Sequence, residues 1–387
     1  MSRILSKLML VLAVASAALS FGAAELHATT TYIVGTCKAG TQFSSIQAAL
    51  DAAPSPNVVE VCPGIYAEQI TIINAVTIEA LSIKNSSYVH ITVPSGGLTT
   101  NTTINGGATS AAAHVFVKNA TGEVNLTGLA VDSAGNNVPT GAALVGILYQ
   151  HSPGTINHVI AVNQVSGQNT GYGIYMEGGS SNPTVTVENC SVHDFDFGGI
   201  YVTGPNGPTA IVGPDVTENV TGQITAKVTN NFVNTTEADG TINMLFGSST
   251  VDTVTGNVSA GADRGAQGLS IDANTGSTFS DNTIIDSAEG ITLLADGPSV
   301  TGNKLYNDGS NGDGAIAVFE NLKTSKITGN TIQNSQFYGI NLGCYTVGTL
   351  VNSNTFEYLA EGFLNAPSGF SGSGTYIATP QDVVPCP

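Results

Sequence analysis

The chain has 387 residues, enough for one large domain or two ordinary ones. Ten lysine and arginine residues against 28 acidic residues give a formal net charge of −18. Nucleic acid and anionic membranes bind clustered Lys and Arg, so this charge balance excludes both as partners. Charged residues make up only 10% of the chain and apolar residues 41%. That composition excludes a disordered protein and is typical of an exported β-rich protein.

The N-terminus has the three parts of a secretory signal peptide. Arg3 and Lys7 supply positive charge, an apolar run follows from Leu8 to Phe21, and small residues end at Ala24. We predict a signal peptide over residues 1–24, whose removal leaves 8 basic against 28 acidic residues, or −20. The mature protein is expected to be secreted or periplasmic, with no membrane span. An uncleaved membrane anchor is the alternative, although the apolar run is short for one.

A short capping helix is expected over residues 43–53, where Phe43, Ile46 and Leu50 fall on one face. Ser44 or Ser45 would be its N-cap, because a serine hydroxyl accepts a hydrogen bond from a free N–H of the first turn. Such a helix would cover the apolar end of the repeat array that follows it.

All five cysteines follow the signal peptide, as suits an oxidising compartment. Cys37 and Cys62 flank the capping helix and are the first predicted disulfide. Cys344 and Cys386 are predicted to tie the C-terminal tail to the body of the protein. Closing each loop with a disulfide would add about 3–4 kcal/mol to the free energy of unfolding. Cys190 is left over, and we expect it to pack as a small buried apolar residue.

One pattern recurs from residue 189 onward: an Asn, an apolar pair, a variable loop, and a Gly that opens a strand of alternating apolar residues. The Asn positions are Asn189, Asn230, Asn257, Asn282, Asn303, Asn330 and Asn354. The last five steps average about 25 residues, and a period of this size indicates a solenoid. Short alternating runs predict parallel strands. Asn and Gly suit left-handed corners, where stacked asparagines can hydrogen-bond the coils above and below.

The expected fold class is all-β: a right-handed parallel β-helix of about 11–12 coils over residues 25–365, with a capping tail over 366–387. A β-sandwich is the alternative, but sandwich strands do not recur with one motif in one register. The 41-residue step from Asn189 to Asn230 indicates a long insertion around Pro205–Pro214. Such insertions often line a binding face.

We expect the protein to be a monomer.

Two adjacent segments resemble the opening of the pectin-lyase-like superfamily. The first runs from Phe43 to Pro54, and the second runs from Val59 to Glu68 and contains a Pro-Gly-x-Tyr-x-Glu turn. In that group of β-helix proteins, which includes pectin methylesterases, a capping helix leads into a strand and this turn. The resemblance implies the fold and leaves the activity open.

The catalytic signatures of that superfamily are matched only in part. The segment Asp-Phe-Asp-Phe-Gly at 194–198 is similar to a motif of the pectin methylesterases, and Arg264 is the only arginine of the mature chain. The resemblance therefore makes Asp194, Asp196 and Arg264 the catalytic candidates. A second Asp motif and a Gly-Arg motif are not visible, and the same segment also suits an ordinary corner loop. The paired Asp motifs of polygalacturonases are matched only loosely, at 308–314.

Acidic residues are enriched between each corner Asn and the following Gly. These windows hold 11 acids in 60 positions, against 7 in the other 114 positions of residues 189–362. Equivalent loops stack in adjacent coils, so we expect a column of carboxylates along one edge, where oxygen-rich loops suit Ca²⁺. The candidate calcium ligands are Asp263, Asp286, Glu289, Asp308 and Asp313. A solvated acidic edge is the alternative.

Tyr175 and Tyr201 are candidates for stacking on a sugar, since Trp is absent. Tyrosines at alternating strand positions also suit packing. Broken catalytic motifs on an intact scaffold favour a non-catalytic exported protein that binds polysaccharide or another glycan, or that serves at the cell surface. The alternative is a carbohydrate-active enzyme: a pectin esterase, a polysaccharide lyase or a glycoside hydrolase.

Overall fold

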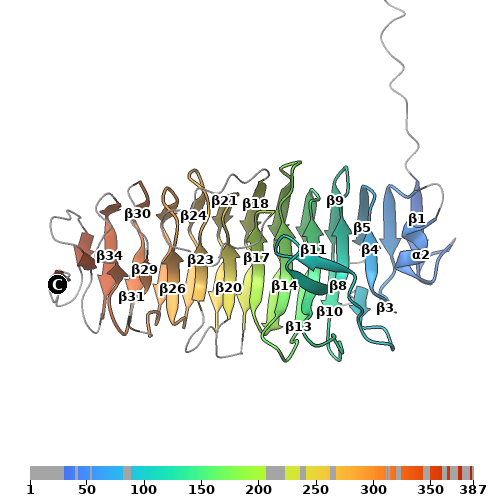
Figure 1. Ribbon diagram of the computed structural model, residues 1–387, viewed down its shortest axis with the longest axis horizontal. Coiled ribbons are helices and arrows are strands. Elements are labelled where there is room, and N and C mark those ends of the chain that lie inside the picture. The colour runs from blue at the N-terminus through green and yellow to red at the C-terminus, as the bar shows by residue number, and fades with distance from the viewer. Residues whose placement is uncertain are drawn as a thin grey trace, which may run out of the picture. The chain divides into compact units, whose positions relative to one another are not determined.

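Three parallel β-sheets are wound around one apolar core (Figure 1). The computed structural model describes residues 30–39, 42–52, 55–81, 89–205, 223–235, 241–261, 267–310, 312, 314–319, 324–342 and 349–359, and the backbone of three short strands near the C-terminus. Residues 31–387 form one compact unit. The predicted signal peptide, most of the tail over 366–387, Cys344 and Cys386 lie outside the described residues.

Beyond the first turn, each complete coil contributes one strand to each sheet. Sheet A has the order β1 (Thr31–Val34), β2 (Val58–Val61), β5 (Val76–Ala80), β9 (Val124–Thr127), β12 (Gly154–Asn157), β15 (Thr184–Glu188), β18 (Ile224–Thr229), β21 (Thr250–Thr255), β24 (Thr278–Ser280), β27 (Ser299–Thr301), β30 (Lys326–Thr328) and β33 (Leu350–Asn352). Sheet B has the order β3 (Gly64–Ala67), β6 (Val89–Thr92), β10 (Leu129–Asp132), β13 (Ile160–Gln164), β16 (Ser191–Phe195), β19 (Phe232–Asn234), β22 (Val258–Ala260), β25 (Thr283–Ile285), β28 (Lys304–Tyr306), β31 (Thr331–Gln333), β34 (Asn354–Glu357) and β36 (Gly374–Tyr376).

Sheet C contains the longest strands. Its order is β4 (Ile70–Ile72), β8 (Thr109–Lys118), β11 (Ala143–Gln150), β14 (Gly171–Glu177), β17 (Gly198–Thr203), β20 (Ile242–Phe246), β23 (Gln267–Ile271), β26 (Glu289–Leu293), β29 (Ile316–Val318), β32 (Ile340–Asn341), β35 (Leu364–Ala366) and β37 (Val384–Pro385). A further strand, β7 (Thr102–Ile104), pairs with β8 in the antiparallel direction, and the neighbours along the three sheet orders pair in parallel.

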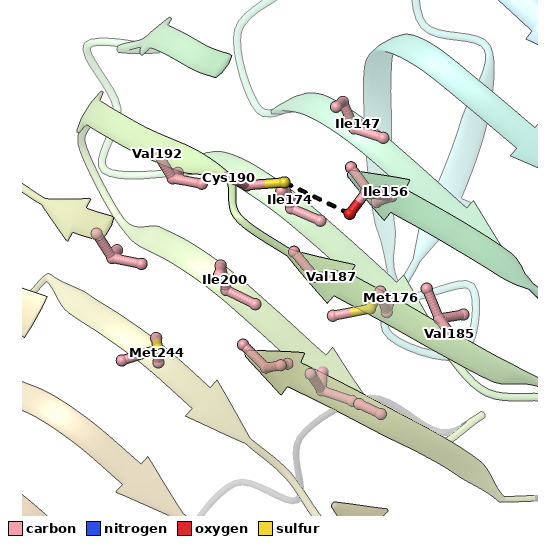
Figure 2. Packing of buried hydrophobic residues seen from close by; sticks show 14 of the residues in the cluster. Ile147, Ile156, Ile174, Met176, Val185, Val187, Cys190, Val192, Ile200 and Met244 are labelled. Atoms are coloured by element: carbon pink, nitrogen blue, oxygen red, sulfur yellow. Dashed lines mark hydrogen bonds between the residues drawn. The ribbon is translucent and has the colours of Figure 1, made fainter. Parts of the chain in front are cut away.

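Alternate side chains of each strand point into the core. Ile78, Leu126 and Ile156 occupy one inward row in successive coils of sheet A, and each is at most 1% exposed. Figure 2 shows the same packing where strands of sheets A and C meet around Ile174 and Val187. The predicted right-handed parallel β-helix is confirmed, and sheets A and B have 12 strands each, in agreement with the predicted 11–12 coils.

Buried asparagine amides form a ladder at the corner between sheets A and B. Its members are Asn231, Asn257, Asn282, Asn303, Asn330 and Asn354. Along the ladder each Nδ2 donates to Oδ1 of the next Asn at 2.9–3.0 Å and to a strand carbonyl of the preceding coil at 2.9–3.1 Å. From Asn257 onward each Oδ1 also accepts the backbone N–H of the preceding Asn, and Oδ1 of Asn231 accepts the N–H of Cys190. The predicted stacking of corner asparagines is confirmed.

At the first two ladder positions the inward-pointing residue comes one residue after the asparagine that the sequence predicted. Asn189 and Asn230 have left-handed φ angles of 55°, and the residues that follow them, Cys190 and Asn231, point inward. The Cys190 thiol donates to Ile156 O at 3.5 Å (Figure 2), as an Asn amide would. Cys190 is 3% exposed, so its predicted burial is confirmed, and burial raises the pKa of its thiol to about 12.

The N-terminal helix is shorter than predicted. Helix α2 spans Ile46–Leu50, with Ser45 as the N-cap. Phe43 lies before it and forms a parallel bridge with Val34 of β1, because its N–H and C=O bond with the strand instead of a helix. No helix among the described residues is long and apolar enough to cross a membrane.

The cap is held by the residues of the Pro-Gly-x-Tyr-x-Glu turn. The Glu68 carboxylate accepts the Ser45 hydroxyl and the N–H groups of Ile46 and Gln47, each at 2.9 Å, so a negative charge lies at the helix N-terminus. The predicted disulfide between Cys37 and Cys62 is confirmed, with a Cα–Cα distance of 5.5 Å. The resemblance of this segment to the pectin-lyase-like superfamily therefore reflects how the first coil is closed.

The ladder predicts a large cost for removing one amide from its middle. Asn282→Ala leaves the Val254 carbonyl and the Asn257 N–H groups without buried partners, and each such group costs about 1–3 kcal/mol. We expect the free energy of unfolding to fall by about 3 kcal/mol or more in denaturant titrations. Asn307→Gly, at an exposed left-handed corner, should change it little. Equal effects of the two substitutions would contradict the ladder's role.

Candidate functional site

Sheet C carries a second apolar cluster on its outer face. Residues 102–111, which form β7, a turn and the start of β8, fold back over this face as an arm. Figure 1 shows the strands of sheet C side by side, with β8, β11, β14 and β17 adjacent. The cluster contains Ile104, Ala111, Ala113, Phe116, Ala143, Val145, Leu148, Tyr172, Tyr175, Tyr201 and Leu245. The arm is therefore anchored to the body of the protein by its own apolar core.

Tyr175 and Tyr201 lie inside this cluster. Their rings are stacked with centroids 5.2 Å apart, and the residues are 0% and 3% exposed. The Tyr175 hydroxyl donates to Oδ1 of Asn105 in the arm at 2.6 Å. The predicted sugar-stacking role does not fit this arrangement, because both rings are buried away from solvent.

A pocket of about 620 Å³ lies between the arm and the corners that lead from sheet C to sheet A. Its described lining consists of Thr103, Gly106, Gly107, Asn119, Ala120, Thr121, Gln150, His151, Glu177, Gly179, Ser180, Ser181 and Pro205. Pro205 is the first residue of the predicted insertion, and residues 206–222 lie outside the described part of the chain.

Gln150 and Glu177 form hydrogen bonds with the arm where it makes one wall of the pocket. They end β11 and β14 and are neighbours in one outward row of sheet C. Gln150 Nε2 donates to Thr103 O at 2.7 Å and to Glu177 Oε2 at 2.6 Å. Glu177 Oε1 accepts the N–H of Gly106 at 3.0 Å. Both side chains thus join two coils of the body to the tip of the arm.

Glu177 is 1% exposed, although it lines the pocket. Burial raises the pKa of its carboxyl above the ordinary value, because the charged form loses water. The hydrogen bonds from Gln150 and Gly106 and the nearby His151 imidazole oppose this shift. A carboxyl with a raised pKa in a pocket is a candidate proton donor.

His151 forms the opposite part of the same corner. It follows Gln150 with a left-handed φ of 53°, directly above Asn119 with a φ of 49° in the preceding coil. The His151 Nδ1 and Asn119 Oδ1 atoms are 3.0 Å apart, which fixes the ring orientation. A Cβ at Gly179 would lie 2.8 Å from His151 Cδ2, so this glycine leaves room for the imidazole.

Asp196, a predicted catalytic residue, holds a loop closed. Its Oδ2 accepts the Ser166 hydroxyl and the Gly167 N–H, both at 2.8 Å. Its Oδ1 accepts the Gly171 N–H at 2.5 Å. Three hydrogen bonds thus occupy its two oxygens and, unlike Glu177, Asp196 does not line the pocket, so its contacts are those of a structural residue.

Asp194 lies at a left-handed corner and Arg264 lies outside the described residues. Asp194 has a φ of 57°, a conformation that Asp and Asn tolerate better than most residues, and its Oδ2 lies 2.8 Å from Nδ1 of His193. The corner conformation accounts for an Asp at this position. The convergence of Asp194, Asp196 and Arg264 on a substrate stays a prediction.

The left-handed corner conformation also explains part of the predicted acidic edge. Asp286 is exposed at an equivalent left-handed corner, with a φ of 58°, and accepts the Asn307 amide at 3.0 Å. Glu289 is only 7% exposed and accepts Gln267 Nε2 at 3.0 Å and the Thr292 hydroxyl. These two carboxylates are therefore held by neutral donors.

The predicted calcium site is not completed by the described residues. Among them, no group of three or more His, Cys, Asp or Glu side chains is arranged to hold a metal ion. Asp263 and Asp313 lie outside the described part of the chain. Calcium binding at this edge stays a prediction.

Asp308 is buried in the corner between sheets B and C. Its Oδ1 accepts the Ser287 N–H at 2.8 Å, and burial raises the pKa of its carboxyl to about 8. Neither Oδ2 nor the Ser287 hydroxyl has a hydrogen bond of good geometry, although the hydroxyl is close enough to oppose part of the shift. Desolvation therefore favours a protonated Asp308 at neutral pH.

This raised pKa predicts a pH-dependent stability. Between about pH 4 and 8 the folded chain keeps a proton on Asp308 that the unfolded chain releases, so the free energy of unfolding falls as the pH rises. Asp308→Asn avoids the buried charge and can donate to the Ser287 hydroxyl. We expect its melting temperature at pH 9 to exceed that of the wild type by about 2 °C or more, with little difference at pH 4.

Asp281→Asn is the matched control for this measurement, because it makes the same chemical change at an exposed left-handed corner and Asp281 does not contribute to the raised pKa of Asp308. Its melting temperature should follow the wild type at both pH values. A destabilised Asp308→Asn variant at pH 9, or a difference that does not depend on pH, would contradict the assignment.

Comparisons with known proteins bear on this fold. Residues 143–356, more than half of the chain, match the family described as "Right handed beta helix region", and no curated protein matches the sequence. The GH136 lacto-N-biosidase of Eubacterium ramulus is similar, with a TM-score of 0.63 and 12% identity over 90% of this chain and 68% of that chain. The DFA-IIIase of Arthrobacter chlorophenolicus A6 without its lid has a TM-score of 0.53 and 13% identity over 92% and 100%. At these identities the two structures share the fold, and the family match shows that this chain belongs to the right-handed β-helix family.

Proposed function

We propose that this protein is exported and binds a glycan in the pocket between the arm and the corners of sheets C and A. The observation that carries the proposal is the lining of a pocket of about 620 Å³ with hydroxyl, amide and peptide groups. Its hydrogen-bonding side chains include Thr103, Asn119, Thr121, Gln150, Ser180 and Ser181. A sugar presents hydroxyl groups on all sides and needs donors and acceptors of this kind.

Export is supported by two independent features. The predicted signal peptide over residues 1–24 would direct the chain out of the cytoplasm. The disulfide between Cys37 and Cys62 is stable in an oxidising compartment. Both agree with a secreted or periplasmic location.

The names of the similar structures support a glycan as the ligand class. One is a lacto-N-biosidase and the other a DFA-IIIase, and both are glycan-acting enzymes with the same scaffold. Their distance in sequence leaves the identity of the sugar open. The argument for this chain therefore depends on its own pocket.

Acid–base catalysis is a second candidate function, favoured by Glu177 and His151 in one pocket. In glycoside hydrolysis a protonated carboxyl gives its proton to the leaving oxygen as the glycosidic C–O bond breaks, and a base takes a proton from the attacking water. Glu177, with its raised pKa, would be the acid. His151, oriented by Asn119, would be the base.

The binding proposal is tested by filling the pocket. Thr121 lines the pocket and is exposed, so Thr121→Trp would occupy ligand space without entering the core. We expect the affinity for a glycan selected from a polysaccharide panel to fall by at least about tenfold, measured by affinity electrophoresis or calorimetry. Thr253→Trp, on the exposed outer face of sheet A, is the matched control and should bind normally.

Catalysis is assayed on the same panel by reducing ends, methanol release and ultraviolet absorbance of unsaturated products. If the second candidate is right, Glu177→Gln abolishes product formation while binding persists.

Unchanged binding by Thr121→Trp would show that the ligand binds elsewhere, and it would contradict the proposed site.

A further inference from the structure

The described lining of the pocket contains only two ionisable side chains. Glu177 is its one carboxylate, and His151 is its one imidazole among the described lining residues. Neither lysine nor arginine occurs in that described lining. The other lining groups are neutral hydroxyls, amides and backbone. A ligand that enters the pocket therefore lies beside one carboxyl group, that of Glu177, which is 1% exposed, with no ammonium or guanidinium among the described lining residues.

The hydrogen bonds of Glu177 do not neutralise its charge. They come from the backbone N–H of Gly106 and the neutral amide of Gln150. Lys118 shares the outward row with Gln150, but it does not line the pocket. Its Nζ lies 5.8 Å from the centre of the Phe116 ring. The hydrogen-bond donors of the carboxylate are thus neutral, and His151 is the one basic side chain among the described lining residues.

We infer that the pocket selects uncharged sugar units and rejects uronic acids, and that Glu177 is the residue that determines this specificity. The inference rests on the proposed glycan binding. A uronate carboxylate in the pocket would lie near the buried Glu177 carboxylate, and two like charges close together repel. A neutral sugar of the same shape carries no such penalty.

Two sources of repulsion can be separated by salt. The net charge of the whole chain also repels anionic polysaccharides, but this long-range field is screened within about 3 Å at 1 M salt. Repulsion between two groups in the pocket is screened much less. A preference for neutral sugars that persists at high salt is therefore a property of the pocket.

The experiment compares sugars that differ only in charge. We would use galacturonan oligosaccharides in fully methyl-esterified and de-esterified forms, and β-glucan oligosaccharides with their C6-oxidised derivatives. Affinities are measured by calorimetry with the full mature protein at low salt and at 1 M NaCl. EDTA is present, so that cations bridging the acidic edge do not contribute.

We expect the wild type to bind the neutral member at least about tenfold more tightly in any pair that it recognises, at both salt concentrations. Glu177→Gln should reduce this ratio several-fold. Asp281→Asn changes the net charge equally at an exposed corner of sheet A and should leave the ratio unchanged.

Three results would overturn the inference. The first is equal or tighter binding of the anionic members by the wild type. The second is an unchanged ratio in a folded Glu177→Gln variant, which would remove Glu177 as the determinant. The third is no binding of either member in any pair, which would also contradict the proposed function and is distinguished from the first two by the absence of any affinity to compare.

Discussion

The regular part of this protein depends on the buried amide ladder of residues 231–354. Each inner amide uses both of its N–H groups and accepts two hydrogen bonds on its oxygen, so it is satisfied in one register only. A slip of one residue in any coil would leave these groups without partners inside the core, and it would turn the apolar row of each strand outward. The ladder therefore converts a loose sequence period into a fixed stacking of coils, even though the loops between the strands vary in length.

The pocket lies where this ladder is missing. Cys190 occupies the first ladder position without an amide. The equivalent residue one coil earlier is Val159, whose carbonyl accepts the Ser191 N–H as the Cys190 carbonyl accepts the Phe232 N–H. In these coils the strands of sheet C lengthen, and the arm covers their outer face with a second apolar cluster. In these coils the arm, in place of the ladder, connects neighbouring coils through its hydrogen bonds with Gln150 and Glu177. The same contacts create a wall with a buried carboxylate, which the uniform coils do not offer.

The sequence allowed the fold to be predicted because its period, its corner residues and its capping segment are local signals. The exact register at Asn230 was less accessible, since Asn230 and Asn231 are both asparagine and only the inward one joins the ladder. Tyr175 and Tyr201 are covered by the arm at residues 102–111, far earlier in the chain, and their alternation gives no hint of that cover. Glu177 lies at the corner between sheets C and A, whereas the acid enrichment marks the corner between B and C. Its only sequence signal is a charged residue at the end of a fully apolar strand.

The central claim is that the ladder amides fix the coil register, and native-state hydrogen exchange tests it most directly. The backbone N–H groups of Asn257, Asn282 and Asn303 each donate to a buried side-chain oxygen, so the account predicts that they exchange together, in the slowest class and only through global unfolding. The exposed turn residues Asn137 and Gly276 should exchange early. Ladder amides that exchange as fast as these turn residues, while the neighbouring strands stay protected, would contradict the claim.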